Sequence, residues 1–371
     1  MEKRKIVIIT DGPSPYRVAH YTFLQSNYKN YDFYIIFATK RSKSELRKWR
    51  ISTDELKNVH YLSQYTVFIR KKYDNRQIFI TYGVYKVLNG IVPDAVVCME
   101  YNPTSIQTMF WCNRKRVPYI SLTDGTLHSE RNIGRMQRLS RKYIMRNASA
   151  FIASSTKAKE KIQSYGVNKA IYVSFLTEDI DKYLIQKQAS GNTNLLYVGS
   201  LIERKGVDLL FIALAQMQQD WNLKIVGTGI LENELREQAI ELGIDARIEF
   251  LGYKQQDELV QLYKQTDVFI LPTREDCYGL VILEAMCASL PVVCSKYADG
   301  AYDLIDDGVS GYLVDPYDAS RFAAKIMEAL NRNQGNNKMG LAAYEKAKTF
   351  SFGNVSSAFI RAIEETINKF A

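Results

Sequence analysis

Residues 267–295 read DVFILPTREDCYGLVILEAMCASLPVVCS and contain the pattern that decides the fold. Two short apolar runs, DVFILP (267–272) and PVVCS (291–295), have the length and β-branched content of buried parallel strands. Between them, Gly279-Leu280-Val281 opens a stretch with the composition of a helix. A strand, a loop, a helix and a second strand in this order predict a parallel sheet covered by its crossover helices.

The same alternation continues on both sides of this stretch. We expect two doubly wound α/β domains, one over residues 1–185 and one over 195–350, joined by a polar linker at 186–194. A final helix over 351–371 can pack back toward the N-terminal domain. Ligands of such sheets bind at the carboxyl ends of the strands, so the expected site is a cleft between the two facing domains. The expected strands are 5–10, 32–37, 94–99, 118–123 and 150–155 in the first half, and 194–200, 222–227 and 247–252 in the second.

Composition narrows the class of protein. The hydrophobic fraction is 46% and the charged fraction 24%, as in ordinary folded proteins. No apolar run approaches the roughly 18 residues of a membrane span, and the N-terminus does not have the pattern of a signal peptide. The five cysteines show no C-x-x-C pair, which favours free thiols. The net charge of +9 is uneven, at +17 for residues 1–190 and −8 for the remainder, so one half is expected to face an anionic membrane or nucleic acid.

Two loops that follow predicted strands contain residues suited to binding an anionic ligand. Asp276 and Glu284 flank seven residues, and the helix that begins near Gly279 can hold an anion with its N-terminal amides. In YVGSLIERKGVDLL (197–210), Arg204 and Lys205 follow a strand, and two cations there suit a diphosphate. The alternative for each loop is a set of solvated charges without a ligand.

A third loop, IVGTGILENEL (225–235), excludes two common nucleotide-binding classes. Gly227 allows close backbone approach, but Glu232 stands where the G-x-G-x-x-G fingerprint needs its third glycine. The chain also lacks a G-x-x-x-x-G-K-[ST] loop. Neither a Walker-type ATPase nor a standard NAD enzyme is predicted.

Together these segments resemble the retaining GT-B glycosyltransferases called group 1, or family four, strongly over 195–316 and more weakly over 1–183. The resemblance implies a nucleoside diphosphate sugar as donor, expected to be a UDP sugar, with no cofactor and no metal. It assigns the ribose to Glu284, the transferred sugar to Asp276 and the diphosphate to Lys205. Ser200 replaces the usual arginine, and Arg204 can compensate. The implied donor-binding residues are Ser200, Arg204, Lys205, Gly227, Tyr253, Asp276, Gly279, Leu280, Val281 and Glu284.

The N-terminal half supplies the acceptor side. SPYRVAHYTFL (14–24) resembles family members that open with a Pro-Tyr-Arg turn, which assigns Tyr16 and Arg17 to the acceptor. Asp124, after the strand 118–123, stands where the family often has a histidine; His128 is the alternative. The resemblance therefore implies that Asp124, Asp276 and Lys205 act in catalysis.

A basic stretch, RNIGRMQRLSRKYIMRN (131–147), has apolar residues at three- and four-residue steps and predicts an amphipathic helix. Its cations can meet anionic lipid or a lipid diphosphate acceptor; the alternative is a core helix with a solvated face. The segment KRSKSELRKWR (40–50), with Trp49 among six cations, also suits a membrane interface. We expect a cytoplasmic protein, peripheral on the inner face of the membrane. The predicted contact residues are Arg135, Arg138, Arg141 and Lys142.

The predicted reaction is retaining, metal-independent glycosyl transfer in cell-surface polysaccharide biosynthesis. Lys205, Arg204 and the helix start near Gly279 would stabilise the departing diphosphate. Asp179-Ile180-Asp181 could be a metal-binding D-x-D, but it lies just before the linker and no further carboxylate cluster supports a hard cation there. Two rival classes stay open: a GT-B-shaped nucleotide-sugar epimerase and a basic nucleic-acid-binding protein. The chain has no recognisable nucleic-acid module, so no nucleic-acid partner is expected.

Overall fold

The computed structural model describes residues 3–40, 51–69, 76–188, 191–333 and 336–370. The chain forms two compact units, one of residues 1–178 with 352–371 and one of residues 179–351. The division lies seven residues before the expected boundary at 185. It does so because the chain after residue 179 already packs on the second unit: the Ile185 N–H donates to the Cys287 carbonyl over 2.9 Å, and Lys187 pairs with Asp267 over 3.5 Å.

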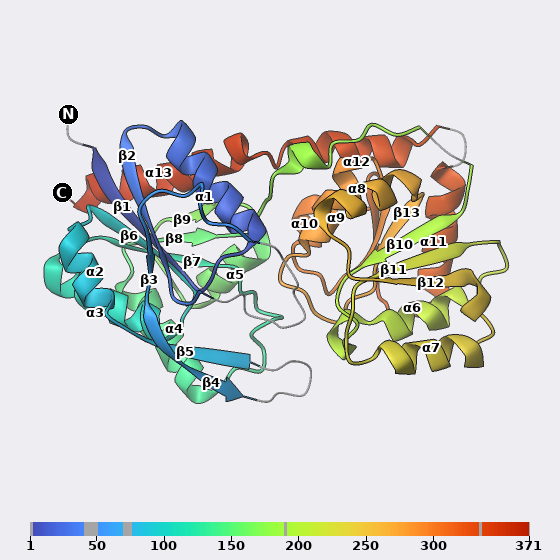
Figure 1. Cartoon of the computed structure of the whole chain (residues 1–371), viewed down its shortest axis with the longest axis horizontal. Coiled ribbons are helices and arrows are strands. Elements are labelled where there is room, and N and C mark those ends of the chain that lie inside the picture. The colour runs from blue at the N-terminus through green and yellow to red at the C-terminus, as the bar shows by residue number, and fades with distance from the viewer. Residues whose placement is uncertain (1–2, 41–50, 70–75, 189–190, 334–335, 371) are drawn as a thin grey trace. The chain divides into compact units, whose positions relative to one another are not determined.

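The first unit is built on a seven-stranded parallel sheet of order β3-β2-β1-β6-β7-β8-β9 (Figure 1). The strand order reverses between β1 and β6, which is the switch point of a doubly wound sheet. All five expected strands of this half are present within a residue or two. The strands are β1 (Arg4–Thr10), β2 (Tyr31–Phe37), β3 (Val59–Tyr61), β6 (Ala95–Met99), β7 (Tyr119–Thr123), β8 (Ala150–Ala153) and β9 (Ile171–Val173).

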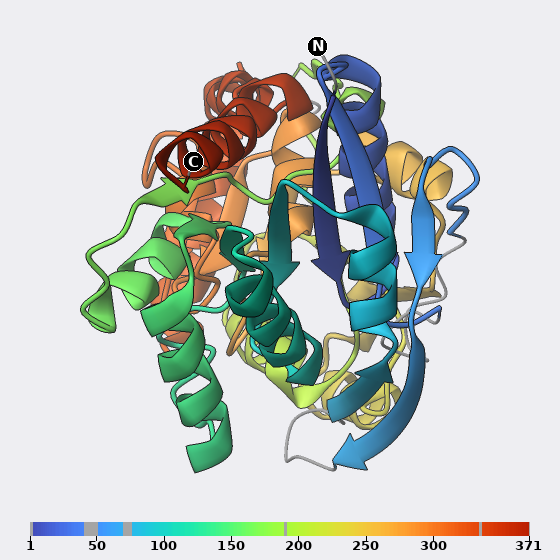
Figure 2. The same cartoon turned by 90° about the vertical axis from the view of Figure 1, so that its left-hand side faces the viewer.

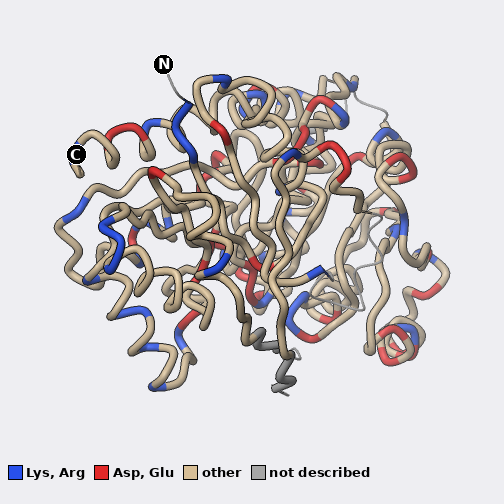
Figure 3. Tube along the Cα trace, turned by 60° about the vertical axis from the view of Figure 1, so that its left-hand side comes forward, with Lys and Arg blue, Asp and Glu red and all other residues tan. Residues whose placement is uncertain are grey.

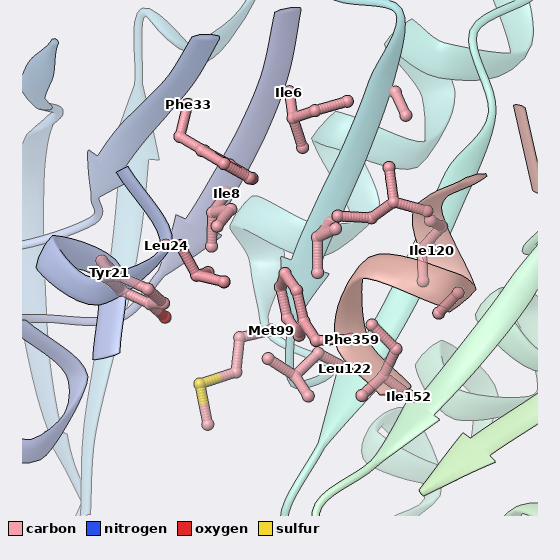
Figure 4. Close-up of a cluster of buried hydrophobic side chains, with 14 of the residues drawn as sticks. Ile6, Ile8, Tyr21, Leu24, Phe33, Met99, Ile120, Leu122, Ile152 and Phe359 are labelled. Carbon is pink, nitrogen blue, oxygen red and sulfur yellow. The ribbon is translucent and has the colours of Figure 1, made fainter. Parts of the chain in front are cut away.

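Helices cover both faces of this sheet because successive strand residues point to opposite sides. In β1, Ile6 and Ile8 enter one core and Val7 and Ile9 the other. The first core, drawn in Figure 4, also contains Phe359 of the C-terminal helix. The helices on that face are α1 (Pro15–Asn27) and α13 (Phe352–Phe370); those on the other are α2 (Val84–Ile91), α3 (Pro103–Lys115), α4 (Arg135–Asn147) and α5 (Thr156–Ser164).

Helix α13 belongs to the first unit although it follows the whole second unit in sequence. It packs on β8 and β9 and contacts α1. His20 of α1 stacks on Phe352, with ring centroids 5.5 Å apart, and its Nε2 lies 2.9 Å from the Ser356 hydroxyl. Burial, with a smaller contribution from Arg17, lowers the pKa of His20 to about 4.

An antiparallel hairpin of β4 (Ser63–Ile69) and β5 (Arg76–Tyr82) stands apart from the seven-stranded sheet (Figures 1 and 2). Its side chains at Tyr65 and Tyr82 are exposed, and their ring centroids lie 5.7 Å apart. The sequence analysis did not predict this hairpin. Its strands, SQYTVFI and RQIFITY, contain one charged residue, Arg76, and their β-branched and aromatic residues are a signal that could have found it.

The second unit is a six-stranded parallel sheet of order β12-β11-β10-β13-β14-β15, with its switch point between β10 and β13. Helices α6 and α7 cover one face, and α8 and α9 cover the other (Figure 1). The strands are β10 (Asn194–Val198), β11 (Asn222–Val226), β12 (Ile248–Gly252), β13 (Val268–Leu271), β14 (Val292–Ser295) and β15 (Gly311–Val314). The helices are α6 (Val207–Leu214), α7 (Glu232–Glu241), α8 (Gln256–Gln265), α9 (Leu280–Cys287), α10 (Ala301–Leu304), α11 (Ala319–Asn333) and α12 (Lys338–Lys348).

Candidate functional site

The switch point of the second sheet brings Lys205 and Asp276 into contact. Lys205 follows β10 and Asp276 follows β13, and these strands are neighbours although some 70 residues separate them. The Lys205 Nζ forms an ion pair with Asp276 Oδ2. The other oxygen, Oδ1, accepts the Tyr278 N–H over 3.3 Å. A cation and a carboxylate therefore meet where doubly wound sheets hold their ligands.

The ionised form of Asp276 is strongly favoured. Burial by itself would raise the pKa of this carboxyl, but Lys205 and then Arg204 outweigh burial and lower the pKa to about 2. The side chains of Lys205 and Asp276 are 13% and 16% exposed. Both groups are thus charged and largely shielded at neutral pH, so their interaction is stronger than that of a surface pair.

The two loops are joined along their length. The Arg204 guanidinium donates to the Glu275 carbonyl over 2.8 Å, and the Arg274 N–H donates to the Arg204 carbonyl over 2.8 Å. The Arg274 guanidinium holds both oxygens of Asp208, over 2.7 and 2.6 Å. These bonds fix the Lys205 loop to the Asp276 loop, and Arg204 lies close enough to influence the Asp276 carboxyl.

Glu284 lies in α9 and is buried. Its Oε2 accepts the hydroxyl of Tyr263, a fully buried residue of α8, over 2.7 Å. Helix α9 begins at Leu280 after Gly279, whose φ of +82° lies in the left-handed region that favours glycine. Val281, in the first turn, is half-buried. The loop that contains Asp276 therefore leads directly into α9, whose first turn and Glu284 carboxylate come next along the chain.

Three further predicted donor residues lie at the carboxyl ends of neighbouring strands. Gly227 follows β11 with φ +135°, and a Cβ there would lie 1.8 Å from the Gly199 carbonyl oxygen. The glycine is therefore required by the chain's own backbone. Ser200 follows β10 and accepts the Tyr197 hydroxyl at its carbonyl over 3.0 Å, and Tyr253 follows β12.

In the first unit, Asp124 lies at the carboxyl end of β7 and is held by three neighbours. Arg17 of α1 donates to its Oδ2 over 2.7 Å, and the Ser154 hydroxyl donates to Oδ1. Its backbone N–H donates to Glu100 Oε1 over 3.0 Å. Burial would lower the pKa of Arg17, but Asp124 raises it. Arg17 and Tyr16 also line a small pocket of this unit.

Arg141 was predicted to face a membrane or an acceptor, and that prediction is wrong. Its side chain turns inward from α4, where Nε and Nη2 donate to the two oxygens of Glu130 over 2.6 and 2.8 Å. The residue is only 7% exposed, and its guanidinium lies 4.9 Å from the Tyr101 ring centroid. Lys161, which is 1% exposed, pairs with the same carboxylate over 2.9 Å. The sequence of α4 alone does not show that Arg141 faces inward, because its partner Glu130 lies in the loop before the helix.

The other four cations of α4, Arg135, Arg138, Lys142 and Arg146, are exposed. So are two apolar residues that the helical pattern placed on the core side, Met136 at 78% and Leu139 at 60%. The regular helix begins only at Arg135, so its first turns extend beyond the core formed by Ile144 and Met145. Residues 41–50, which include Trp49, lie outside the described residues.

The sequence analysis missed several residues of these networks. Tyr263 lies on an ordinary amphipathic helix, and Lys161 lies in TKAKEKIQS, which has the composition of an exposed helix. Glu100 was missed too, although its place directly after a predicted strand is a signal that could have found it. None of the helices in the described part of the chain is both long and apolar enough to cross a membrane. Within the same residues, no three His, Cys, Asp or Glu side chains are grouped to bind a metal.

Known proteins share both the fold and part of the sequence. Anabaena HepE, solved in complex with UDP, superposes with a TM-score of 0.76 at 17% identity and covers 98% of this chain and 100% of its own. An uncharacterized glycosyltransferase of Methanocaldococcus jannaschii is 26% identical over 224 residues, 60% of this chain and 62% of the relative. A D-inositol 3-phosphate glycosyltransferase of Corynebacterium kroppenstedtii is 29% identical over 187 residues, 48% of this chain and 41% of the relative. The match thus spans less than two thirds of either relative.

The two doubly wound sheets and this structural likeness define a GT-B fold, as the sequence predicts. Residues 180–346 match the family described as Glycosyl transferases group 1. This range contains the whole Lys205–Asp276 site and Glu284. The chain therefore has a GT-B fold, and most of its second unit matches the group 1 glycosyltransferase family.

Proposed function

We propose that this chain is a retaining, metal-independent glycosyltransferase that moves a sugar from a nucleoside diphosphate sugar to a hydroxyl of a glycan or lipid-linked acceptor. The observation that carries the proposal is the Lys205–Asp276 pair at the switch point of the group 1 region. A largely shielded lysine that is paired with a carboxylate can exchange that partner for a phosphate. The released carboxylate can then accept hydroxyl hydrogen bonds from the sugar.

The main predicted residues have the following roles in this scheme. Lys205, Arg204 and the start of α9 stabilise the charge that develops on the departing diphosphate. Glu284 accepts the ribose hydroxyls, and its bond from Tyr263 fixes the carboxylate. Asp276 and Asp124 position the transferred sugar. Retention follows if the acceptor attacks from the face that the diphosphate leaves.

Uridine is the base that we propose. HepE has been solved with UDP, with UDP and glucose, and with UDP-glucose. In this chain, Tyr253 follows β12, and a UDP whose diphosphate lay at Lys205 would extend toward the neighbouring strand ends. The proposal for the base and the sugar comes from this likeness and from the shared order of strands.

For the acceptor side, we propose contact with an anionic membrane surface, on the cytoplasmic face, in cell-surface polysaccharide assembly. Helix α3 packs between α2 and α4, and the three helices together contain eight Lys and Arg and no Asp or Glu (Figure 3). Phe110, Met136 and Leu139 on α3 and α4 are at least half exposed. Exposed apolar side chains among cations are the composition of an interfacial helix. Each cation near anionic lipid contributes about 1 kcal/mol.

A screen of nucleotide sugars tests the donor half of the proposal. The purified chain is incubated in EDTA with UDP-, GDP- and ADP-sugars and with octyl glycosides as acceptors, and the released nucleoside diphosphate and the product are measured. Release of UDP with a new glycoside is the expected result. An epimerase would instead convert the donor into an isomeric nucleotide sugar. Turnover that needs added manganese or magnesium would contradict metal independence.

Vesicle sedimentation tests the membrane half. We expect binding to vesicles with anionic lipid, none to neutral vesicles, and release by high salt as the Debye length falls to about 3 Å at 1 M. Replacing Arg135, Arg138 and Lys142 with Glu should abolish binding. The same charge change at Lys264, Arg321 and Lys338, which are exposed cations of the second unit, is the matched control and should weaken binding little. Equal loss in both triple variants would point to net charge alone, and binding to nucleic acid instead of vesicles would favour the rival class.

A further inference from the structure

Glu100 is held in a backbone conformation that glutamate avoids. It follows β6 with φ +61°, in the left-handed region. A residue with a Cβ loses roughly 1–2 kcal/mol there, whereas glycine does not. The conformation is fixed on one side by the Glu100 N–H, which donates to the Leu122 carbonyl over 2.8 Å. Five other non-glycine residues of the described chain share a positive φ, and Glu100 differs from them because it directly follows a strand, where a strained residue points to a role for its side chain.

The position is the ligand-binding edge of the first sheet. Strand β6 lies between β1 and β7, and the strand order reverses between β1 and β6. Glu100 Oε1 accepts the backbone N–H of Asp124 over 3.0 Å, so its carboxyl group lies directly beside the loop that we assign to the reacting sugar. Ser154 and Arg17, which hold Asp124, both line the small pocket of this unit.

Glu100 differs from its two acidic neighbours, Asp124 and Glu130, in its ion pairing. Asp124 is paired with Arg17, and Glu130 is paired with Arg141 and Lys161. Over the described part of the chain, no Lys or Arg nitrogen lies within 4.0 Å of the Glu100 carboxylate. Burial raises the pKa of Glu100, as do Asp124 and Glu130, and Lys161 offsets this only in part. The two neighbours are occupied by internal partners, while Glu100 keeps acceptor capacity for a ligand.

We propose that Glu100 binds the acceptor, with its carboxylate accepting a hydrogen bond from an acceptor hydroxyl next to the one that attacks. This inference rests on the proposed function. It makes the acceptor a polyhydroxylated compound, such as a glycan, that binds at the ligand-binding edge of the first sheet. Glu100 takes no part in the covalent step. In that step the bond from the anomeric carbon to the diphosphate breaks, a bond to the acceptor oxygen forms, and the hydroxyl proton leaves on the released nucleoside diphosphate.

Glu100→Gln tests the contact. It keeps the shape but removes the charge, and a hydrogen bond to a charged group is worth about 1.5–3 kcal/mol, or roughly 10- to 100-fold. With UDP-glucose and an octyl glycoside, the loss should fall on kcat/KM for the acceptor, mainly through KM. Hydrolysis of UDP-glucose by water and the affinity for UDP should stay unchanged, because neither involves the acceptor. A merely structural role of Glu100 would instead lower acceptor transfer, hydrolysis and UDP affinity together.

Glu100→Gly tests the strain without a ligand. The variant relieves the strain but also removes the acceptor of the Asp124 N–H, so the two effects should offset and the melting temperature should stay near that of the wild type. Acceptor transfer should fall as in Glu100→Gln. Val92→Gly is the matched control, because Val92 is a 68% exposed residue of the same unit with φ +53°. It should raise the melting temperature and leave transfer unchanged.

An unchanged acceptor KM for Glu100→Gln in an active chain, or unchanged acceptor transfer in Glu100→Gly, overturns the assignment of Glu100. If the wild-type chain releases no UDP from any UDP-sugar tested, the proposed function is overturned instead. The two failures are therefore distinguishable.

Discussion

Replacing Lys205 with methionine removes the cation from the buried pair and tests how the site is built. Methionine keeps most of the side-chain volume, so packing changes little. Asp276 keeps its charge and loses its main favourable partner, because Lys205 lowers the Asp276 pKa more than Arg204 does. Removing one partner of a buried ion pair leaves the other charge uncompensated, and this lowers the free energy of unfolding more than removing both partners does.

The magnitude follows from the pKa. The pKa of the Asp276 carboxyl is about 2 in the fold, against an ordinary value of 3.8, and a shift of this size is worth about 2.5 kcal/mol at 1.36 kcal/mol per pH unit. Most of that stability should be lost in Lys205→Met. For a unit of this size, a loss of this order lowers the melting temperature by roughly 5–10 °C. The contribution is present above pH 3.8 and is lost in the wild type as the pH falls through 2.

The assay combines thermal unfolding at pH 7 with turnover of UDP-glucose. Lys205→Met should unfold earlier and lose turnover by about 100-fold, the scale of losing one charge-stabilising donor. The double variant Lys205→Met, Asp276→Asn should recover most of the stability but none of the turnover, because the orphaned charge is gone and the diphosphate ligand is still missing. A Lys205→Met variant as stable and as active as the wild type would refute the reasoning.

Three further predictions concern single residues. Glu284→Gln should weaken UDP binding about tenfold or more, because a ribose acceptor loses its charge; calorimetric affinity equal to the wild type would contradict the ribose assignment. Asp124→Asn should lower transfer about tenfold or more and leave UDP affinity unchanged, since Asp124 belongs to the other unit; loss of both would indicate a structural role. His20 has a folded pKa of about 4 against 6.5, so its contribution to stability is complete above pH 6.5 and up to about 3 kcal/mol is lost as the pH falls through 4. Urea midpoints measured from pH 7.5 to 4 should therefore fall more steeply in the wild type than in His20→Asn.

The sequence predicted the architecture because buried parallel strands have a strong signature. The eight strands quoted outside the opening stretch, and the two within it, all occur within one to three residues of their expected bounds. The loops after β10 and β13 were predictable for the same reason, since the residue that follows a buried strand lies at the ligand-binding edge. Lys205 and Asp276 meet there, as a shared site requires.

The direction of individual side chains could not be predicted in the same way. Arg141 and Arg138 are three residues apart on one helix, yet Glu130 draws the first inward and nothing in the sequence marks Glu130 as its partner. Met136 and Leu139 fit the apolar period but lie on turns that extend beyond the core. The division of the chain at residue 178 likewise depends on contacts of Ile185 and Lys187 with the second unit, which no local composition reveals.

Calorimetric titration of UDP in EDTA tests the central claim most directly, because it isolates the diphosphate site from the unknown acceptor. The wild-type chain should bind one UDP with no added metal, and Lys205→Met should bind at least about tenfold more weakly, as expected for losing a charge-assisted contact to phosphate. Absence of binding in the wild type, or equal affinity in Lys205→Met, would contradict a nucleoside diphosphate site at the switch point of the second unit.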